Sequence, residues 1–368
     1  MLFGCRDGCV YCLRAADGAL VWRFRAAPDR RLVSFEQVES LWPVQGSVLV
    51  QDGVVYFAAG RSSFLDGGIM VYGLDAKTGK VLHHHLLEGP WPDITKDVGA
   101  PFAMEGAQPD LIVSDGKDLY MQRIKFGPQL NRLETTQESP LGELDMGVIH
   151  LVATGGFLDD TGFDRLFWMY GRRWPGFYFA QHSPKAGQLV VFDESTTYAV
   201  KYFYRRHIWS PIFFPAEQGY LLFADNNDNE PILEEKGQPP KAMDWLPKEA
   251  ATDRYRRGGR GAEKGTGYVR EKPTKWQEMI PLRIRAMVLA GDRLFAVGLP
   301  DVLDPDDPWA SFEGRKGAEL RVFSAKDGSE VSSRPLALSP AFDGLSAAAG
   351  RLYLSTNDGR VICLAGKP

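Results

Sequence analysis

The chain repeats one short pattern along most of its length, and this repetition limits the fold more than any other feature. One unit joins two apolar runs through a polar turn with Asp-Gly or Thr-Gly, as in VYCLRAADGALVW (10–22), VYGLDAKTGKVLH (71–83) and LRVFSAKDGSEV (320–331). A second unit alternates apolar residues around a tight turn, as in VLVQDGVVYFA (48–58), LIVSDGKDLYM (111–121) and MVLAGDRLFAV (287–297). Alternation with a period of two, broken by glycine turns, is typical of antiparallel hairpins.

Two such hairpins in every 45–60 residues or so predict a four-stranded sheet, and a series of these sheets indicates a β-propeller. We therefore predict an all-β fold, a β-propeller of four-stranded antiparallel blades, of which seven are recognisable. Their second strands are expected near residues 1–4, 54–59, 118–123, 165–170, 219–224, 292–297 and 351–356. The sequence begins inside a blade and ends after the third strand of another. We therefore expect upstream residues to be missing, and eight blades in an untruncated chain are the alternative.

Residues 1–368 are expected to form a single propeller domain with a flexible insertion at about residues 226–280. Within this insertion, the stretch 253–275 is rich in glycine, lysine and arginine. Such a composition favours a mobile loop with a charged surface.

Eight residues of the first repeat match the pattern DG-x-V-Y-x-L-x-A-x-x-G-x-x-x-W, namely Asp7, Gly8, Val10, Tyr11, Leu13, Ala15, Gly18 and Trp22. In this pattern the chain resembles the PQQ-like β-propeller repeat, as found in propeller proteins of planctomycete-type bacteria. It is more distantly similar to the outer-membrane assembly lipoprotein and to quinoprotein alcohol dehydrogenases. The resemblance implies that the tryptophan closing a blade docks between neighbouring blades. Only Trp22 is identified at this position, and His83 stands there in the second blade.

The resemblance does not extend to a catalytic centre. Quinoprotein dehydrogenases, as a family, use a vicinal pair of cysteines, and this chain has no adjacent cysteines. We therefore expect no cofactor, with PQQ and calcium as the alternative.

Three cysteines near the N-terminus have the spacing of iron–sulfur ligands, but we expect no iron–sulfur cluster. Cys9 and Cys12 lie three positions apart on one predicted strand, so their side chains face opposite sides, and Cys5 lies across the turn. We expect packing residues there. The same alternation places His84 opposite His83 and His85, which leaves at most two imidazoles on one face.

Composition excludes some classes of partner and leaves the compartment open. The formal net charge of -4 and the pI of about 5.9 give no indication of nucleic-acid binding. No apolar run approaches the roughly 18 residues of a membrane span. The first residues do not form a signal peptide. The chain is thus predicted to be cytoplasmic, or periplasmic or exported if an upstream signal is missing.

Loops at one end of a propeller usually form its binding surface. Two of them, AAGRSSFLDGG (58–68) and GGFLDDTGFD (155–164), share a Phe-Leu-Asp core, which indicates a shared structural role or a shared ligand-facing surface. Two other segments, 170–182 and 204–210, combine arginine with aromatic residues and histidine, which can contact a sugar or a protein. The candidate ligand or partner surface comprises Arg61, Asp66, Asp159, Arg172, Arg173, Trp174, His207 and Trp209.

Two acidic stretches complete the candidates. DNNDNE (225–230) concentrates the oxygen ligands that calcium prefers, and its alternative is a turn that begins the insertion. LPDVLDPDDPW (299–309) is either part of an acidic rim or a plain loop.

These features predict a non-catalytic binding or interaction module that holds a protein or carbohydrate partner with loops at one end of the ring. The alternative is an enzyme, either a PQQ-dependent oxidoreductase or a propeller-type polysaccharide lyase that uses arginine, histidine and tyrosine.

Overall fold

The computed structural model describes residues 1–34, 37–44, 47–89, 111–121, 124–134, 136–137, 144–153, 168–174, 183–202, 205–207, 210–212, 216, 219–230 and 272–365. All regular structure in these ranges is β-strand, which confirms the predicted all-β class. No helix long and apolar enough to cross a membrane occurs in these ranges.

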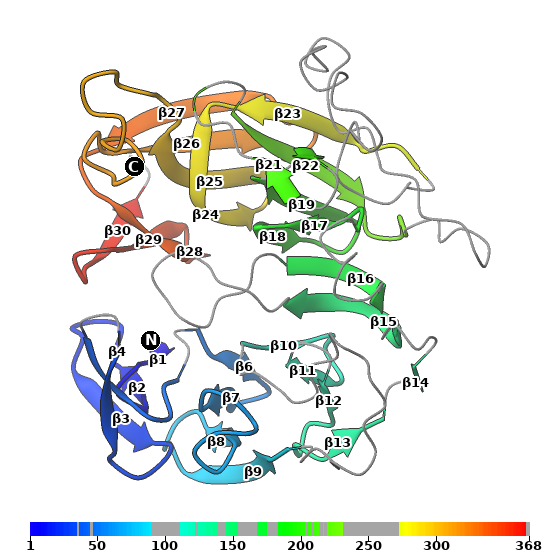
Figure 1. Cartoon of the computed structure of the whole chain (residues 1–368), viewed down its shortest axis with the longest axis vertical. Helices are drawn as coiled ribbons and strands as arrows, with labels where there is room; N and C mark the ends of the chain where they lie inside the picture. The colour runs from blue at the N-terminus through cyan, green and yellow to red at the C-terminus, as the bar shows by residue number, and fades with distance from the viewer. Residues whose placement is uncertain are drawn as a thin grey trace. The chain divides into compact units, whose positions relative to one another are not determined.

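Seven sheets follow one another along the chain as the blades of a β-propeller, which confirms the predicted fold (Figure 1). Paired strands within a blade are antiparallel, and we letter the strands A to D in chain order. Blades 1 and 7 have three strands each in the described residues, and blades 2 to 6 have four. The chain divides into two compact units, Met1–Pro140 with Leu144–Leu166 and Leu141–Glu143 with Phe167–Pro368, and each is described by itself.

The first unit holds blades 1 to 3 and two strands of blade 4. Its strands are β1 (Leu2–Gly4), β2 (Cys9–Leu13) and β3 (Leu20–Arg25) in blade 1; β6 (Leu49–Gln51), β7 (Val54–Ala59), β8 (Ile69–Asp75) and β9 (Val81–Leu87) in blade 2; β10 (Ile112–Ser114), β11 (Leu119–Met121), β12 (Ile124–Phe126) and β13 (Arg132–Leu133) in blade 3; and β14 (Thr136–Gln137) and β15 (Leu144–Ala153) in blade 4. A separate hairpin, β4 (Arg31–Ser34) and β5 (Gln37–Ser40), links blades 1 and 2.

The second unit holds the remaining strands. They are β16 (Trp168–Trp174) and β17 (Ala186–Gly187) in blade 4; β18 (Leu189–Phe192), β19 (Thr196–Lys201), β22 (Tyr220–Asn226) and β23 (Trp276–Ile280) in blade 5; β24 (Leu282–Ala290), β25 (Arg293–Pro300), β26 (Ala318–Ser324) and β27 (Glu330–Leu336) in blade 6; and β28 (Pro340–Ala348), β29 (Arg351–Thr356) and β30 (Val361–Ala365) in blade 7. The hairpin β20 (Arg205–His207) and β21 (Ser210–Ile212) lies between β19 and β22. The predicted insertion is bounded by β22 and β23.

The alternation of residues along a strand decides which side chains pack toward the preceding blade and which pack toward the following blade. On β7, Val55 and Phe57 pack toward blade 1, whereas Tyr56 and Ala58 pack toward blade 3. Blade 2 therefore buries both faces of its central strands against its neighbours, which is why its apolar runs are nearly continuous.

The C–D turn is the most regular part of the repeat. A β-bulge follows Cys12 in blade 1, Gly73 in blade 2 and Val322 in blade 6, at equivalent positions. Each turn then closes on a glycine with positive φ, at Gly18, Gly79 and Gly328 (φ 74°, 69° and 76°). Glycine adopts this conformation without steric cost, so these turns reverse the chain where the sequence predicts.

Tryptophan docking occurs twice in the part of the chain that the structure describes. Trp22 on β3 donates its Nε1–H to the Ala76 carbonyl at 3.1 Å, and Trp276 on β23 donates to the Ala325 carbonyl at 3.0 Å. The prediction that only Trp22 holds this position was therefore wrong. The long B–C connection and the insertion of blade 5 hide the repeat there, so Trp276 could not be aligned with Trp22 from the sequence.

The cysteines and histidines lie as the strand alternation predicts. Cys9 is fully buried on β2, Cys12 is half-buried on the same strand, and Cys5 lies in the turn before it. Burial raises the pKa of the Cys5 and Cys9 thiols. On β9 the ring of His84 packs on Tyr72, on the blade 1 side, and that of His85 on Phe126 of blade 3.

Candidate functional site

The B–C connections of blades 2, 5 and 6 are long. Because successive strands run antiparallel, the B–C connections leave a sheet at the end opposite to its A–B and C–D turns. The B–C connections span residues 60–68 in blade 2, 202–219 in blade 5 and 301–317 in blade 6, whereas the A–B turns of blades 2 and 6 have two residues each. In blades 2 and 6 the B–C end of the sheet therefore carries a much longer loop than the A–B end.

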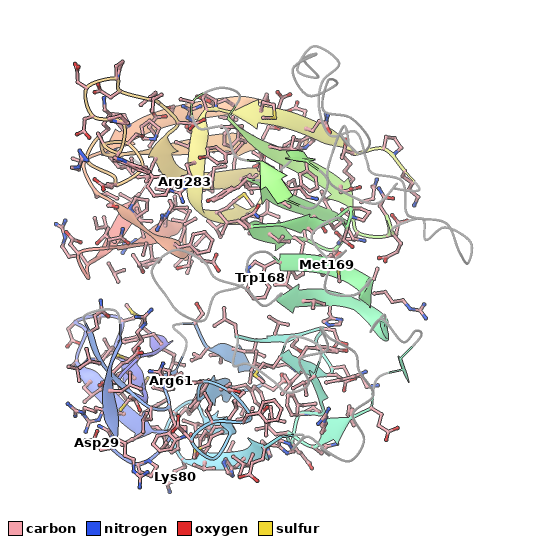
Figure 2. The ribbon with its side chains drawn as sticks, viewed as in Figure 1. Asp29, Arg61, Lys80, Trp168, Met169 and Arg283 are labelled. Carbon is pink, nitrogen blue, oxygen red and sulfur yellow. The ribbon has the colours of Figure 1, made fainter. Side chains whose placement is uncertain are left out.

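Two predicted residues, Arg61 and Asp66, lie on the B–C connection of blade 2 (Figure 2 labels Arg61). Arg61 donates to Glu39 Oε1 at 2.5 Å and to the Ser40 carbonyl at 3.1 Å, and the Glu39 side chain is only 3% exposed. The Asp66 carbonyl accepts the Trp42 Nε1–H at 3.0 Å. These contacts attach the connection to the β4–β5 hairpin.

None of the other predicted residues belongs to this connection. Arg172 is exposed on β16, toward the C–D end of blade 4. The strand β16 also contains Arg173 and Trp174, and β20 contains His207, but these three side chains lie outside the described residues. Asp159 and Trp209 lie outside them altogether.

Among the described residues, an exposed aromatic pair that the sequence analysis missed lies on the B–C connection of blade 6, residues 301–317, here called the aromatic loop. Trp309 is 63% exposed and Phe312 is 42% exposed, and their rings meet edge to face with centroids 6.0 Å apart. Val302 and Leu303 on the same loop are also exposed. The signal was the spacing Trp-x-x-Phe in a loop where apolar residues have no core to fill.

A buried arginine contacts the aromatic loop. Arg283 on β24 is almost fully buried, and its guanidinium carbon lies 3.9 Å from the centroid of the Phe312 ring (Figure 2 labels Arg283). The Tyr202 ring is the second aromatic neighbour, at 5.9 Å. Cation–π contacts of this kind strengthen when the cation is shielded from water, so Arg283 holds Phe312 in place.

Ion pairs hold the acidic part of the loop. Lys316 Nζ contacts Asp304 Oδ2 at 2.6 Å, and Arg315 pairs with both Asp307 and Glu313. Two of the four aspartates of the stretch 299–309, Asp304 and Asp307, are thus paired with basic residues of the same loop.

The loops of blades 5 and 6 are joined. The Asp301 carboxylate accepts the Ala216 amide at 2.9 Å, and burial raises the pKa of Asp301. The Tyr202 hydroxyl donates to the Ile284 carbonyl. The aromatic loop is thus anchored to its own blade and to the preceding one.

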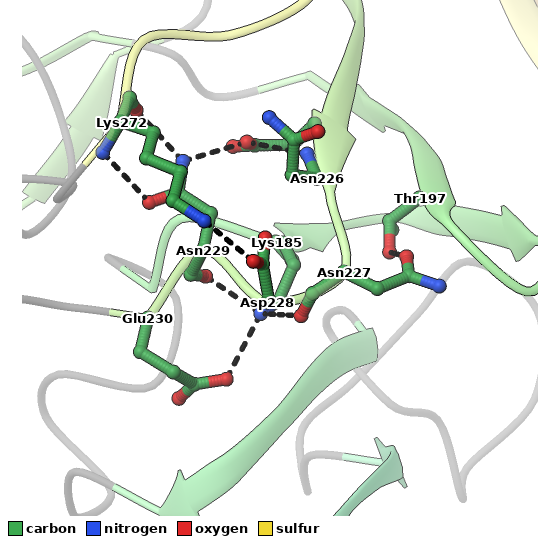
Figure 3. Close-up of polar contacts among 9 residues, drawn as sticks. Lys185, Thr197, Asn226, Asn227, Asp228, Asn229, Glu230 and Lys272 are labelled. Atoms are coloured by element: carbon green, nitrogen blue, oxygen red, sulfur yellow. Dashed lines mark hydrogen bonds and ion pairs between the residues drawn. The ribbon is translucent and has the colours of Figure 1, made fainter.

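The stretch 225–230, here called the polar turn, holds an internal cation (Figure 3). Lys185 Nζ donates to the carbonyls of Asn227 and Asn229, both at 2.6 Å, and to Glu230 Oε1 at 2.9 Å. The Lys185 side chain is 2% exposed. Of the side-chain oxygens that suggested a calcium site, Glu230 Oε1 accepts from this ammonium group, whereas Asn229 Oδ1 accepts the Lys272 amide and Asp228 pairs with Lys272 Nζ.

The polar turn also fastens the two ends of the insertion. The Asn229 side-chain amide donates to the Lys272 carbonyl at 2.7 Å, and its oxygen accepts the Lys272 amide at 3.0 Å. The Asn229 side-chain amide thus makes the same two hydrogen bonds to Lys272 that a backbone amide of a neighbouring strand would make. The alternative interpretation, a solvated turn at the start of the insertion, gives the position, but the turn is not solvated throughout, because Asp225 and Asn229 are fully buried.

The residues do not fit a quinone–calcium centre. The sequence has no adjacent cysteines, and the Asn227 and Asn229 carbonyls and Glu230 Oε1 of the polar turn accept hydrogen bonds from Lys185. In the part of the chain that the structure describes, no cluster of three or more His, Cys, Asp or Glu side chains could hold a metal ion. We therefore derive no reaction step through either group.

Comparison with known proteins agrees with the repeat. Residues 2–140 match the model of a PQQ-like repeat family described as outer membrane protein assembly factor BamB, which confirms the resemblance seen in the sequence. No curated protein matches the chain.

Several solved structures are similar to the chain at low sequence identity. BamB from Moraxella catarrhalis is 11% identical, with a TM-score of 0.42, and the match covers 100% of this chain and 79% of that one. The quinohemoprotein alcohol dehydrogenase ADHIIG from Pseudomonas putida HK5 is 12% identical, with a TM-score of 0.40, and the match covers 96% of this chain and 60% of the enzyme. The C-terminal WD40 domain of Sif2 is 8% identical, with a TM-score of 0.44, and the match covers 100% of this chain and 78% of that domain.

Proposed function

We propose that the chain is a non-catalytic module that binds a protein partner through the aromatic loop of blade 6. The observation that carries this proposal is the exposed pair Trp309 and Phe312 on a loop anchored by ion pairs and by Arg283. An exposed apolar cluster with polar neighbours is typical of an interaction surface rather than of a plain loop.

The composition of the loop suits a binding hot spot. Tryptophan and arginine dominate the binding energy of most interfaces, and a ring of charged residues around them excludes water. Here the ion pairs of Arg315 and Lys316 stand beside the aromatic pair. A loop already fixed in shape loses little conformational entropy on binding, which favours affinity. The family name matched by residues 2–140, a protein assembly factor, is consistent with this function.

The test is partner capture by chemical crosslinking with the tagged full chain in extracts of the source cells, followed by mass spectrometry. We expect Trp309→Ala and Phe312→Ala to lose at least nine tenths of the captured partner. The control Leu82→Ala removes an exposed apolar side chain of β9 and should capture the partner at the wild-type level. If both aromatic variants capture the partner at the wild-type level, the aromatic loop is not the partner-binding surface.

The residues predicted from the sequence define a second surface to be tested in the same experiment. Alanine at Arg172, Arg173 or Trp174 would weaken capture if the partner binds at the C–D end of blade 4. A polysaccharide lyase would instead release unsaturated products from uronate polymers, which a rise in ultraviolet absorbance detects.

A further inference from the structure

The outer strand of blade 2, β9, is an unprotected sheet edge. In the described part of the chain it is the last strand of its sheet and hydrogen-bonds to β8 alone (Figure 1). Its sequence, VLHHHLL, contains no lysine, arginine, aspartate, glutamate or proline. Every second residue of such a strand turns its N–H and C=O outward, so the edge is able to pair with a further strand.

The other long outer strands contain the residues that oppose such pairing. Charged side chains and proline on an edge discourage the addition of a strand. These residues include Arg23 and Arg25 on β3, Glu278 on β23, and Arg334 and Pro335 on β27. A β-bulge is common to β3, β9 and β27, so it does not set β9 apart. Among these four strands, only β9 lacks a protecting side chain.

The edge also exposes apolar side chains. Leu82 is 49% exposed and Leu86 is 42% exposed, and His84 between them is exposed as well. Residues two positions apart share a face of a strand, and on this face the His84 ring packs on Tyr72 with centroids 4.6 Å apart. Blades 1 and 3 flank blade 2 within the same unit and leave these three side chains uncovered.

The sequence of β9 is nearly symmetric about His84. A histidine lies one position before and one after it, and a leucine lies two positions before and two after it. In an antiparallel pair of two β9 strands centred on His84, Leu82 of each copy lies opposite Leu86 of the other, and His84 lies opposite His84. Apolar side chains directly opposite each other stabilise a sheet. A two-fold symmetric dimer requires a self-complementary surface of this kind.

We propose that the chain forms a two-fold symmetric dimer in which β9 pairs with β9 of a second copy, centred on His84. The sheet of blade 2 then continues into the same sheet of the other copy. Few residues of each strand take part, and small interfaces are typical of weak, reversible association. The dimer does not use the aromatic loop of blade 6, so it is independent of the function proposed above.

The first test is sedimentation equilibrium of the full chain at micromolar to millimolar concentrations. We expect the wild type to dimerise reversibly. His84→Lys places two positive charges opposite each other at the symmetry axis and should raise the dissociation constant of the dimer at least tenfold. The matched control is Val331→Lys, which adds the same charge at an exposed apolar position of the outer strand β27. It should dimerise like the wild type.

Cysteine crosslinking tests the register in a Cys363→Ser background, which removes an exposed native thiol. His84→Cys places two thiols opposite each other, within the Cα separation that a disulfide spans, so oxidation with diamide should link the two copies. Leu86→Cys is the matched control, because Leu86 lies opposite Leu82 of the other copy and not opposite itself. It should form at least tenfold less linked dimer.

The proposal fails if the wild type remains monomeric at millimolar concentration, or if His84→Lys dimerises as strongly as the wild type. It also fails if Val331→Lys weakens the dimer as much as His84→Lys does, because the charge then acts without regard to the strand that carries it. Equal crosslinking of Leu86→Cys and His84→Cys would contradict the pairing centred on His84.

Discussion

At the scale of single residues, Lys185 places a positive charge inside the second unit and has three oxygen partners there. We expect Lys185→Met to lower the free energy of unfolding by about 3 kcal/mol, because two carbonyls and the Glu230 carboxylate lose their donor in a buried site. Urea unfolding measures the change. Lys316→Met, which breaks the half-exposed pair with Asp304, should change it by less than about 1 kcal/mol. Equal losses in the two variants would show that Lys185 carries no special stabilisation.

The same scale includes a pH dependence at Asp115. Burial opposes ionisation of this carboxylate, but hydrogen bonds from the amides of Asp118 and Lys117 and from the Tyr120 hydroxyl outweigh it and lower its pKa. The folded pKa lies below the unfolded value of about 3.9, so the stabilisation is complete above that pH and is lost as pH falls through the folded pKa. Asp115→Asn should therefore show a shallower loss of stability between pH 6 and pH 3. Urea titrations at both pH values test this, and an unchanged slope would contradict it.

At the scale of elements, the C–D turns allow a matched comparison. Gly18 and Gly328 have nearly the same positive φ, but only Gly328 lies under an indole. Gly18→Ala should cost about 1 kcal/mol for the left-handed backbone. Gly328→Ala should cost about 2 kcal/mol more, because its Cβ would collide with Trp276. Urea unfolding of the two variants measures these costs. Equal losses of unfolding free energy would mean that the Trp276 ring shifts without cost.

The elements also show where prediction from the sequence reaches its limit. The turns at Gly18, Gly79 and Gly328 could be predicted because their signal lies within a few residues. The docking of Trp276 could not, since a long insertion separates β22 from β23 and breaks the spacing of the repeat. The aromatic loop was interpreted from its acidic residues, and the basic residues that pair with Asp304 and Asp307 follow up to a dozen positions later.

At the scale of the whole molecule, the polar turn indicates that the fold does not need the insertion. Asn229 and Lys272 are paired through both hydrogen bonds of the Asn229 amide, so the ends of the insertion already lie together. Replacing residues 232–270 by Gly-Gly-Ser-Gly should leave the free energy of unfolding unchanged or raise it by up to about 2 kcal/mol, since a shorter loop costs less entropy to close. Urea unfolding and far-ultraviolet circular dichroism test this. Loss of the β-sheet signal would show that the insertion is required for folding.

The sequence by itself determined the strands, their turns and the propeller class, because a hairpin is encoded by alternation and by glycines that adopt positive φ within a dozen residues. Only the tertiary structure decided which side chains meet. Lys185 lies 44 positions from Asn229, and Trp22 lies 54 positions from Ala76. No local pattern specifies such pairs. They form because neighbouring blades pack face to face, and that packing brings a buried ammonium to carbonyl oxygens and an indole to a glycine.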